Sequence, residues 1–282
     1  MGRVRTWLAR NRERLAVWTL VVVLLAVLGV LLYFGTPFHG SEASIQAVQG
    51  DEQINLEQRG GDYVLSPASG TSEVGLVFYP GARVHPDAYL SSLSPLVTEA
   101  SVTVVITKMP LNLAVLEQGA ASGVIGQHGV EQWYVGGHSL GGAMACRYAG
   151  ENPERVSGVV LFGSYCDRSI SDSGLRVLSV VGKQDTVLDW NKYENSKENL
   201  PASATIRELA GVNHTQFGSY TGQSGDGPSG TTYAVAHRRL ANVTVPWFRR
   251  ASERATQGVS RVTESHSMSS PTSANTIRLR TP

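Results

Sequence analysis

The chain has 282 residues, of which 41% are hydrophobic and 17% are charged. This composition is typical of one sizeable globular domain with extra segments at its ends. The formal net charge of +1 provides no strong field for nucleic acid. The sequence also lacks C-x-x-C, H-E-x-x-H and Walker-type motifs, so we expect no nucleic-acid partner, metal or organic cofactor.

The N-terminus has the pattern of a membrane anchor. Residues 1–14 contain five arginines and one glutamate, and residues 15–34 carry no charge. A helix of that length spans roughly 30 Å, the thickness of a hydrocarbon core. Arginines favour the cytoplasmic side, so residues 1–14 are predicted to be cytoplasmic and the rest of the chain to face outward from the cell membrane.

A cleaved signal peptide is the alternative, because Ser41-x-Ala43 fits a small-x-small cleavage site. The apolar run is longer than the usual h-region of about 7–15 residues, which favours a retained anchor. Pro37 also interrupts the approach to the site. A buried core helix is disfavoured by the arginine-rich flank. Both remaining interpretations export the domain, as a single-pass membrane protein or as a secreted one.

After a linker at 35–43, residues 44–250 show alternating strand and helix patterns. Runs such as VGLVFY and VTVVIT are almost wholly apolar, as in strands buried on both faces. Strands are predicted at 44–49, 62–66, 74–79, 102–107, 133–136, 156–163, 175–182 and 205–209, and helices at 87–100, 112–128, 140–149, 191–200 and 231–247. This order predicts an α/β fold with a mostly parallel sheet and helices on both faces. Residues 251–282 lack a periodic apolar face and are predicted to be a disordered tail.

The most specific motif is Gly137-x-Ser139-x-Gly141. It lies between a predicted strand and a predicted helix, the setting that a nucleophile elbow requires. Such a turn exposes the serine hydroxyl at the carboxyl edge of the sheet, and the backbone N–H of Leu140 can stabilise an oxyanion there. Ser139 is therefore the predicted nucleophile.

A serine hydroxyl needs a base, and the base needs a carboxylate that orients it. In elbow-type hydrolases the chain order is serine, acid, histidine. Asp185 follows the predicted strand at 175–182, and His214 follows the one at 205–209, so these two residues are the predicted acid and base. A second oxyanion donor is expected in the loop after 74–79, from the N–H of Gly81 or Ala82, because Pro80 has none.

Over residues 60–250 this set of features resembles the α/β-hydrolase superfamily. Three stretches, at Phe78–Tyr89, Met109–Leu116 and Gly211–Gly227, are similar to small bacterial hydrolases of the dienelactone-hydrolase-like branch. The resemblance implies an eight-stranded core and a triad of Ser139, His214 and Asp185. Dienelactone hydrolases proper use a cysteine nucleophile, whereas this chain has Ser139.

Few residues separate Phe162 from Leu175, which leaves no room for a lid domain. We therefore expect an open pocket for small or short acyl groups, with Phe217 and Tyr220 as candidate substrate contacts, although packing of their own loop is an alternative role. Cys146 and Cys166 are either a disulfide, which an exported domain permits, or two buried thiols.

The predicted function is a membrane-anchored serine hydrolase that acts on small-molecule carboxylic esters or thioesters through an acyl-enzyme. The alternatives are an acyltransferase with the same triad and a non-catalytic binding protein that keeps the fold.

Overall fold

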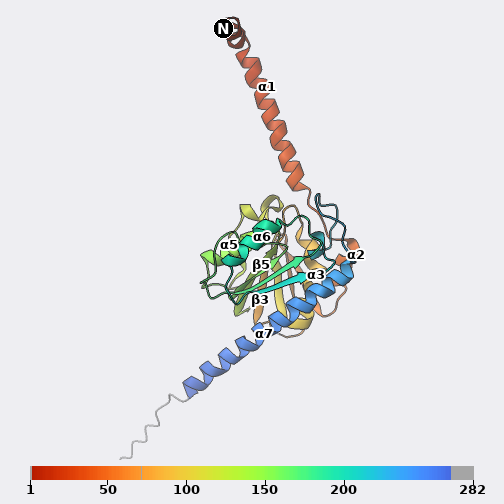
Figure 1. Cartoon of the computed structure of the whole chain (residues 1–282), viewed down its shortest axis with the longest axis vertical. Helices are drawn as coiled ribbons and strands as arrows, with labels where there is room; N and C mark the ends of the chain where they lie inside the picture. Colours follow the sequence, from red (N-terminus) through yellow and green to blue (C-terminus); the bar gives the residue numbers. More distant parts are fainter. Residues whose placement is uncertain (1, 71, 268–282) are drawn as a thin grey trace, which may run out of the picture.

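The computed structural model describes residues 2–70 and 72–267. Its centre is a single eight-stranded sheet in the order β1-β2-β4-β3-β5-β6-β7-β8 (Figure 1). The strands are β1 Ile54–Arg59, β2 Asp62–Pro67, β3 Val74–Tyr79, β4 Val102–Ile106, β5 Gln132–His138, β6 Gly158–Phe162, β7 Arg176–Gly182 and β8 Thr205–Leu209. β1 and β2 are antiparallel additions at one edge, and the strands from β4 to β8 run parallel to one another. The predicted fold class is therefore confirmed.

Helices cover both faces of the sheet. The helices are α1 Gly2–Gly35, which projects away from the sheet, and α2 Glu42–Gln49, α3 Leu90–Ala100, α4 Ala121–Val124, α5 Leu140–Glu151, α6 Trp190–Ser196 and α7 Tyr233–Ser267. Alternate residues of β3 face opposite layers: Leu76 packs with α3 and α7, and Val77 packs with α5. This pattern explains why β3 is apolar along its whole length, since every one of its side chains is buried.

The N-terminal part of the domain differs from the prediction. Residues 44–49 belong to α2 and not to a strand, while the strand β1 was missed. Ser41 is the N-cap of α2, and its hydroxyl accepts a hydrogen bond from the Ser44 N–H, at 3.3 Å. Glu42 follows in the first turn, where a negative charge favours a helix. This start signal outweighs the weak alternation that favoured a strand.

The predicted helix at 112–128 is also wrong. The segment contains only the 3₁₀ turns η2 Pro110–Asn112 and η3 Ala114–Leu116, followed by the short helix α4. Gly126 and Gly129 have φ values of +92° and +64°, which no right-handed helix allows. The apolar residues at 113–124 do not share one buried face, since Val124 is buried and Leu116 is exposed.

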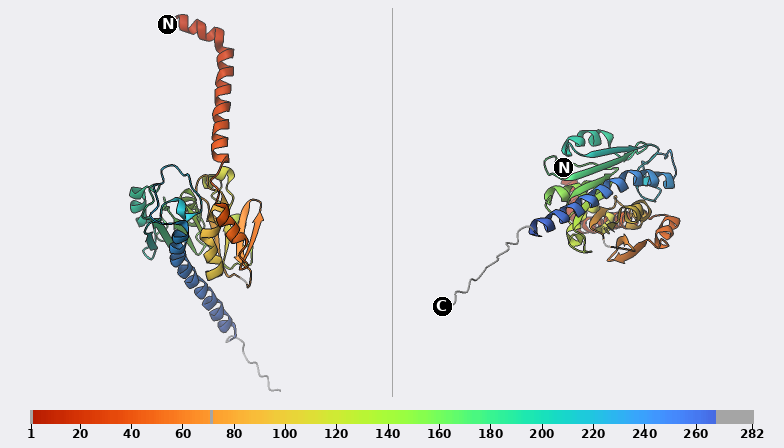
Figure 2. Two further views of the ribbon diagram at one scale, coloured as in Figure 1. Left: turned by 90° about the vertical axis from the view of Figure 1, so that its right-hand side faces the viewer. Right: turned by 90° about the horizontal axis from the view of Figure 1, so that it is seen from below.

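α1 extends away from the domain and bends near its N-terminal end (Figure 2). Its segment Asn11–Gly35 has a mean hydropathy of 3.0 and is long and apolar enough to cross a membrane. The following residues, expected as a linker, are attached to the domain. Phe38 pairs with Val84 as an isolated β-bridge, and the Ser41 N–H donates to the carbonyl of Ser219, at 2.9 Å.

At the other end, α7 continues through Ser267, so the predicted disorder from 251 is wrong up to that residue. No proline occurs between 247 and 267, so nothing in the sequence forces the helix to stop at 250. The remainder of the predicted tail, 268–282, lies outside the described residues.

The two cysteines form a disulfide between α5 and the loop that follows β6. The Cα atoms of Cys146 and Cys166 are 5.6 Å apart, and 20 positions separate them in the chain. Closing a loop of this length contributes about 3 kcal/mol to stability in the chain-entropy model. The bond fixes the β6–β7 loop to the helix that begins directly after Ser139.

Candidate active site

Ser139 occupies a sharp turn between β5 and α5. Its backbone has φ +54° and ψ −125°. A positive φ is energetically unfavourable for a residue with a side chain. The turn is closed by two hydrogen bonds: the Ser139 N–H donates to the carbonyl of Phe162, at 3.0 Å, and the Ser164 hydroxyl donates to the carbonyl of Ser139, at 2.7 Å. Ser164 was not identified from the sequence.

The flanking glycines are required by close backbone contacts. A Cβ on Gly137 would lie 2.5 Å from the Gly141 carbonyl carbon. A Cβ on Gly141 would lie 2.1 Å from the Tyr79 carbonyl oxygen. The first turn of α5 therefore packs directly on the end of β3, and the G-x-S-x-G pattern has a steric origin.

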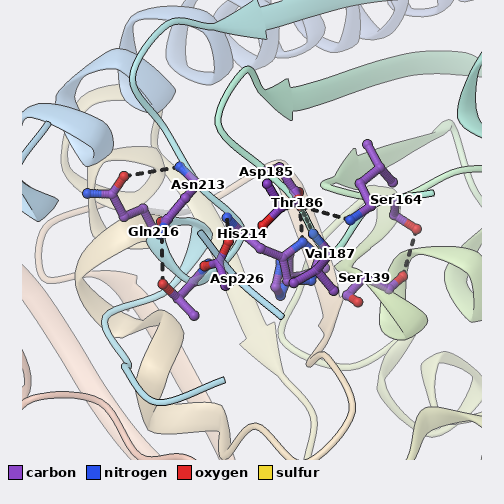
Figure 3. A network of polar contacts seen from close by, with 12 residues as sticks. Ser139, Ser164, Asp185, Thr186, Val187, Asn213, His214, Gln216 and Asp226 are labelled. Atoms are coloured by element: carbon purple, nitrogen blue, oxygen red, sulfur yellow. Dashed lines mark hydrogen bonds and ion pairs between the residues drawn. The ribbon is translucent and has the colours of Figure 1, made fainter. Parts of the chain in front are cut away.

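The acid and the base meet beside this turn (Figure 3). Asp185 follows β7, His214 follows β8, and His214 Nδ1 lies 2.7 Å from Asp185 Oδ2. The other carboxylate oxygen, Oδ1, accepts hydrogen bonds from the N–H groups of Val187 and Leu188, at 2.9 and 2.8 Å. Both side chains are almost fully buried. Two backbone donors thus fix the carboxylate in the orientation that receives a proton of the imidazole.

His214 Nε2 is buried without a hydrogen-bond partner. His214 and Ser139 line the same pocket of about 250 Å³, together with Leu140, Ala143, Gly163, Ser164, Tyr165, Val187, Leu188 and Asp189. The loops after β5, β6, β7 and β8 all contribute to it. The structure therefore brings the three predicted residues together at the carboxyl edge of the sheet.

Two further residues support the histidine. Asp226 accepts hydrogen bonds from the N–H groups of His214 and Thr215, at 3.1 and 2.9 Å. Gly163 has φ +49°, and a Cβ there would lie 3.1 Å from Asp185 Oδ2 and 3.2 Å from His214 Nδ1. Neither role was predicted, because each depends on a contact between loops that are distant in the sequence.

The candidate oxyanion donors are not equivalent. Leu140 is the first residue of α5 and lines the pocket, and the first N–H groups of a helix have no intrahelical acceptor. The Gly81 N–H donates to the Tyr89 hydroxyl, at 2.9 Å. Gly81 and Ala82 are not among the residues that line the pocket. The hydrogen bond of Gly81 makes Ala82 the better candidate of the two.

The prediction that Phe217 and Tyr220 contact substrate is wrong. Both are fully buried and neither lines the pocket. The Phe217 ring stacks on Phe162 and the Tyr220 ring stacks on Phe38, each at 5.7 Å between centroids. Their apolar character serves the packing of the loop that carries His214.

His138 lies behind the catalytic histidine. Its Nδ1 is 3.0 Å from the Tyr89 hydroxyl, and its ring centroid is 4.3 Å from that of His214. Burial is the main reason that the pKa of His138 lies well below its usual value of 6.5, and the nearby His214 lowers this pKa further. Nδ1 therefore accepts the hydroxyl proton of Tyr89, and His138 stays neutral.

We expect this neutral histidine to make stability pH-dependent. Below pH 6.5 the unfolded chain binds a proton at His138 that the native protein does not bind, so the free energy of unfolding falls as the pH is lowered. Each such group contributes up to about 1.4 kcal/mol per pH unit. Denaturant unfolding of wild type and His138→Asn between pH 7.5 and 5.5 should give a shallower dependence for the variant. Asparagine keeps an acceptor for Tyr89, and equal slopes would refute this role.

The sheet, the elbow and the carboxylate–histidine pair at its carboxyl edge define the α/β-hydrolase class of folds. The family model described as "Alpha/beta hydrolase family" matches residues 75–237, and the chain belongs to this family. No curated protein is significantly similar in sequence.

Several solved structures share the fold at low sequence identity. The lip1 protein of Acinetobacter baumannii AYE is 12% identical over 76% of this chain and 97% of its own, with a TM-score of 0.55. The esterase domain of a Rhodothermus marinus protein is 13% identical over 70% and 97%, with a TM-score of 0.52. A monoacylglycerol lipase of Paleococcus ferrophilus is 16% identical over 70% and 99%, with a TM-score of 0.51. These similarities establish the fold, and the narrower resemblance to the dienelactone-hydrolase-like branch stays a prediction.

Proposed function

We propose that this protein is a serine hydrolase that cleaves small or short-chain carboxylic esters or thioesters. The observation that carries the proposal is the hydrogen bonding of the two ring nitrogens of His214. One ring nitrogen is bound to Asp185, the other is buried and unpartnered, and His214 lines the same pocket as Ser139. A general base needs this arrangement, because one nitrogen must be held in the N–H tautomer while the other is free to accept a proton.

The reaction then proceeds through an acyl-enzyme. Ser139 Oγ attacks the carbonyl carbon as its proton passes to His214 Nε2. The N–H groups of Leu140 and Ala82 bind the oxyanion of the tetrahedral intermediate. His214 returns the proton to the leaving alcohol or thiol, and the acyl group remains on Ser139. A water molecule that is deprotonated by His214 releases the acid and restores the enzyme.

The pocket supports small acyl groups. Its volume is about 250 Å³, and the β6–β7 loop over it contains neither a helix nor a strand. The disulfide of Cys166 holds this loop against α5. Ligand pockets of drug-sized molecules measure about 300–1,000 Å³, so the site favours compact acyl chains.

Ser139→Ala tests the proposal. Hydrolysis of a short-chain nitrophenyl ester by the purified full chain should fall about a thousandfold or more, since the covalent route is lost. The free energy of unfolding should change little, because the hydroxyl makes no hydrogen bond that holds the turn. Retention of most of the activity by the variant would contradict the proposal.

We further propose that α1 is retained as an anchor and that the hydrolase domain is extracytoplasmic. The disulfide suits an oxidising compartment. Cleavage after Ala43 would remove Phe38, which forms a β-bridge with Val84 and stacks on Tyr220. Protease added to intact cells or spheroplasts should degrade the domain, whereas protection until lysis would contradict this topology.

A further inference from the structure

Among residues 36–70 and 72–253, the exposed large apolar side chains are confined to one short segment. They are Leu111, Val115 and Leu116, with exposed fractions of 39%, 44% and 54%. We call Pro110–Leu116 the apolar loop; it consists of η2, η3 and the residue between them. A soluble surface scatters such residues, so their concentration in one loop indicates a contact surface.

The apolar loop lies where α1 joins the domain. The Asn112 side-chain amide donates to the carbonyl of Phe34 near the end of α1, at 2.8 Å. The carbonyl of Asn112 accepts a hydrogen bond from the Arg83 N–H, at 2.8 Å. The Arg83 guanidinium in turn lies 3.8 Å from the centre of the Tyr33 ring. The loop and the last turn of the apolar helix are thus held in one unit (Figures 1 and 2).

The exposed Leu111 has an unfavourable backbone conformation. Leu111 has φ +49°, the left-handed region that glycine and asparagine usually occupy. The next residue, Asn112, has φ +56° and uses its side chain to bind α1. Burial of the Leu111 side chain in an apolar medium would offset part of the cost of this conformation.

The same loop lies at the edge of the sheet that carries the catalytic pocket. It follows β4, whose carboxyl end shares an edge of the sheet with that of β5, where Ser139 lies. η3 packs against α5, the helix that contributes Leu140 and Ala143 to the pocket. The end of α1, the apolar loop and the catalytic pocket therefore lie on one side of the domain.

We propose that the apolar loop inserts into the outer leaflet of the membrane that α1 spans, and that the substrate is an amphiphilic ester dissolved in that membrane interface. This inference rests on the proposed serine-hydrolase function and the retained anchor. The occupant is lipid because the loop is hydrogen-bonded to the end of α1, whose segment Asn11–Gly35 is apolar enough to span a bilayer. Arg83 and Lys108 lie next to the loop as cations, which suit the headgroup level of a leaflet.

This docking explains how a pocket of about 250 Å³ can serve an amphiphile. The acyl group enters the pocket, while the apolar remainder of the alcohol stays in the lipid and needs no protein groove. Docking also holds the pocket next to the leaflet, so the substrate moves laterally to the enzyme and does not have to enter water.

A depth measurement tests the insertion in the full chain, reconstituted in phosphatidylcholine nanodiscs. Because Cys146 and Cys166 are paired, a thiol-reactive NBD dye labels only an introduced cysteine. Leu116→Cys is the test position. The matched control is Ser203→Cys, because Ser203 is exposed and precedes β8, at the amino edge of the sheet. Lipids that carry a nitroxide on the upper acyl chain should quench the dye at 116 and not at 203. Absence of quenching at 116 overturns the proposal. If energy transfer between labelled copies is observed and quenching is not, the loop is a self-association surface.

A second experiment separates docking from chemistry. The triple variant Leu111→Asn, Val115→Ser, Leu116→Ser removes the apolar surface, and asparagine suits the positive φ at 111. In nanodiscs it should hydrolyse a water-soluble short-chain ester within about twofold of wild type, while its rate on a short-acyl ester embedded in the bilayer falls about tenfold. Equal losses on both substrates, or none on either, would refute the proposal. Failure of the serine-hydrolase function itself would appear separately, as wild type that hydrolyses neither ester although the label at 116 is quenched.

Discussion

Replacing Asp185 with asparagine should lower kcat for ester hydrolysis about ten-thousandfold and leave the protein folded. The asparagine Oδ1 can keep the hydrogen bonds from Val187 and Leu188, which places its NH₂ group against His214 Nδ1. Because that NH₂ group only donates, the imidazole must carry its proton on Nε2, where it can no longer accept the proton of Ser139.

The control for this variant is Asp189→Asn. Asp189 is a nearby carboxylate that lines the pocket, and it caps the N-terminus of α6 by accepting a hydrogen bond from the Lys192 N–H, at 3.1 Å. Asparagine caps helices about as well as aspartate, so activity should stay within a few-fold. Steady-state kinetics of both variants, with circular dichroism to verify folding, decide the assignment. A larger loss for Asp189→Asn than for Asp185→Asn would contradict it.

Gly141→Ala should destabilise the protein by roughly 3 kcal/mol or more and abolish activity. The new methyl carbon would lie 2.1 Å from the Tyr79 carbonyl oxygen and 2.4 Å from that of Pro80, and both are backbone atoms that cannot rotate away. α5 would have to move away from β3, which displaces Ser139.

Gly123→Ala in α4 is the matched control, because nothing lies within 4 Å of the added Cβ. Alanine also favours a helix over glycine, so stability should stay within about 1 kcal/mol of wild type or increase. Denaturant unfolding of the two variants in the same detergent gives the comparison. Similar midpoints for both would contradict the steric account of the G-x-S-x-G pattern.

The parts of the fold that were predictable are those with strong local signals. β3 and β4 are buried on both faces and are therefore apolar at nearly every position. The elbow is predictable because steric contacts at Gly137 and Gly141 leave glycine as the residue that fits. Asp185 and His214 followed from chain order once the elbow was recognised.

Several of the errors have a physical origin in long-range contacts. At 112–128, apolar residues of a winding chain mimic the spacing of a helix although they do not share one buried face. Phe217 and Tyr220 are conspicuous aromatics near His214, but burial of a side chain in a loop depends on what packs over it. The roles of Asp226 and Gly163 depend on contacts with His214 across loops, which a single sequence does not reveal.

The central claim is that Ser139 is an activated nucleophile, and labelling with a fluorophosphonate probe tests it most directly. The full chain in detergent or nanodiscs is treated with the probe, and the adduct is located by mass spectrometry. The account predicts one adduct per chain, on Ser139, and its absence from Ser139→Ala and from heat-unfolded protein. A folded wild type that remains unlabelled, or an adduct on another residue, would contradict it.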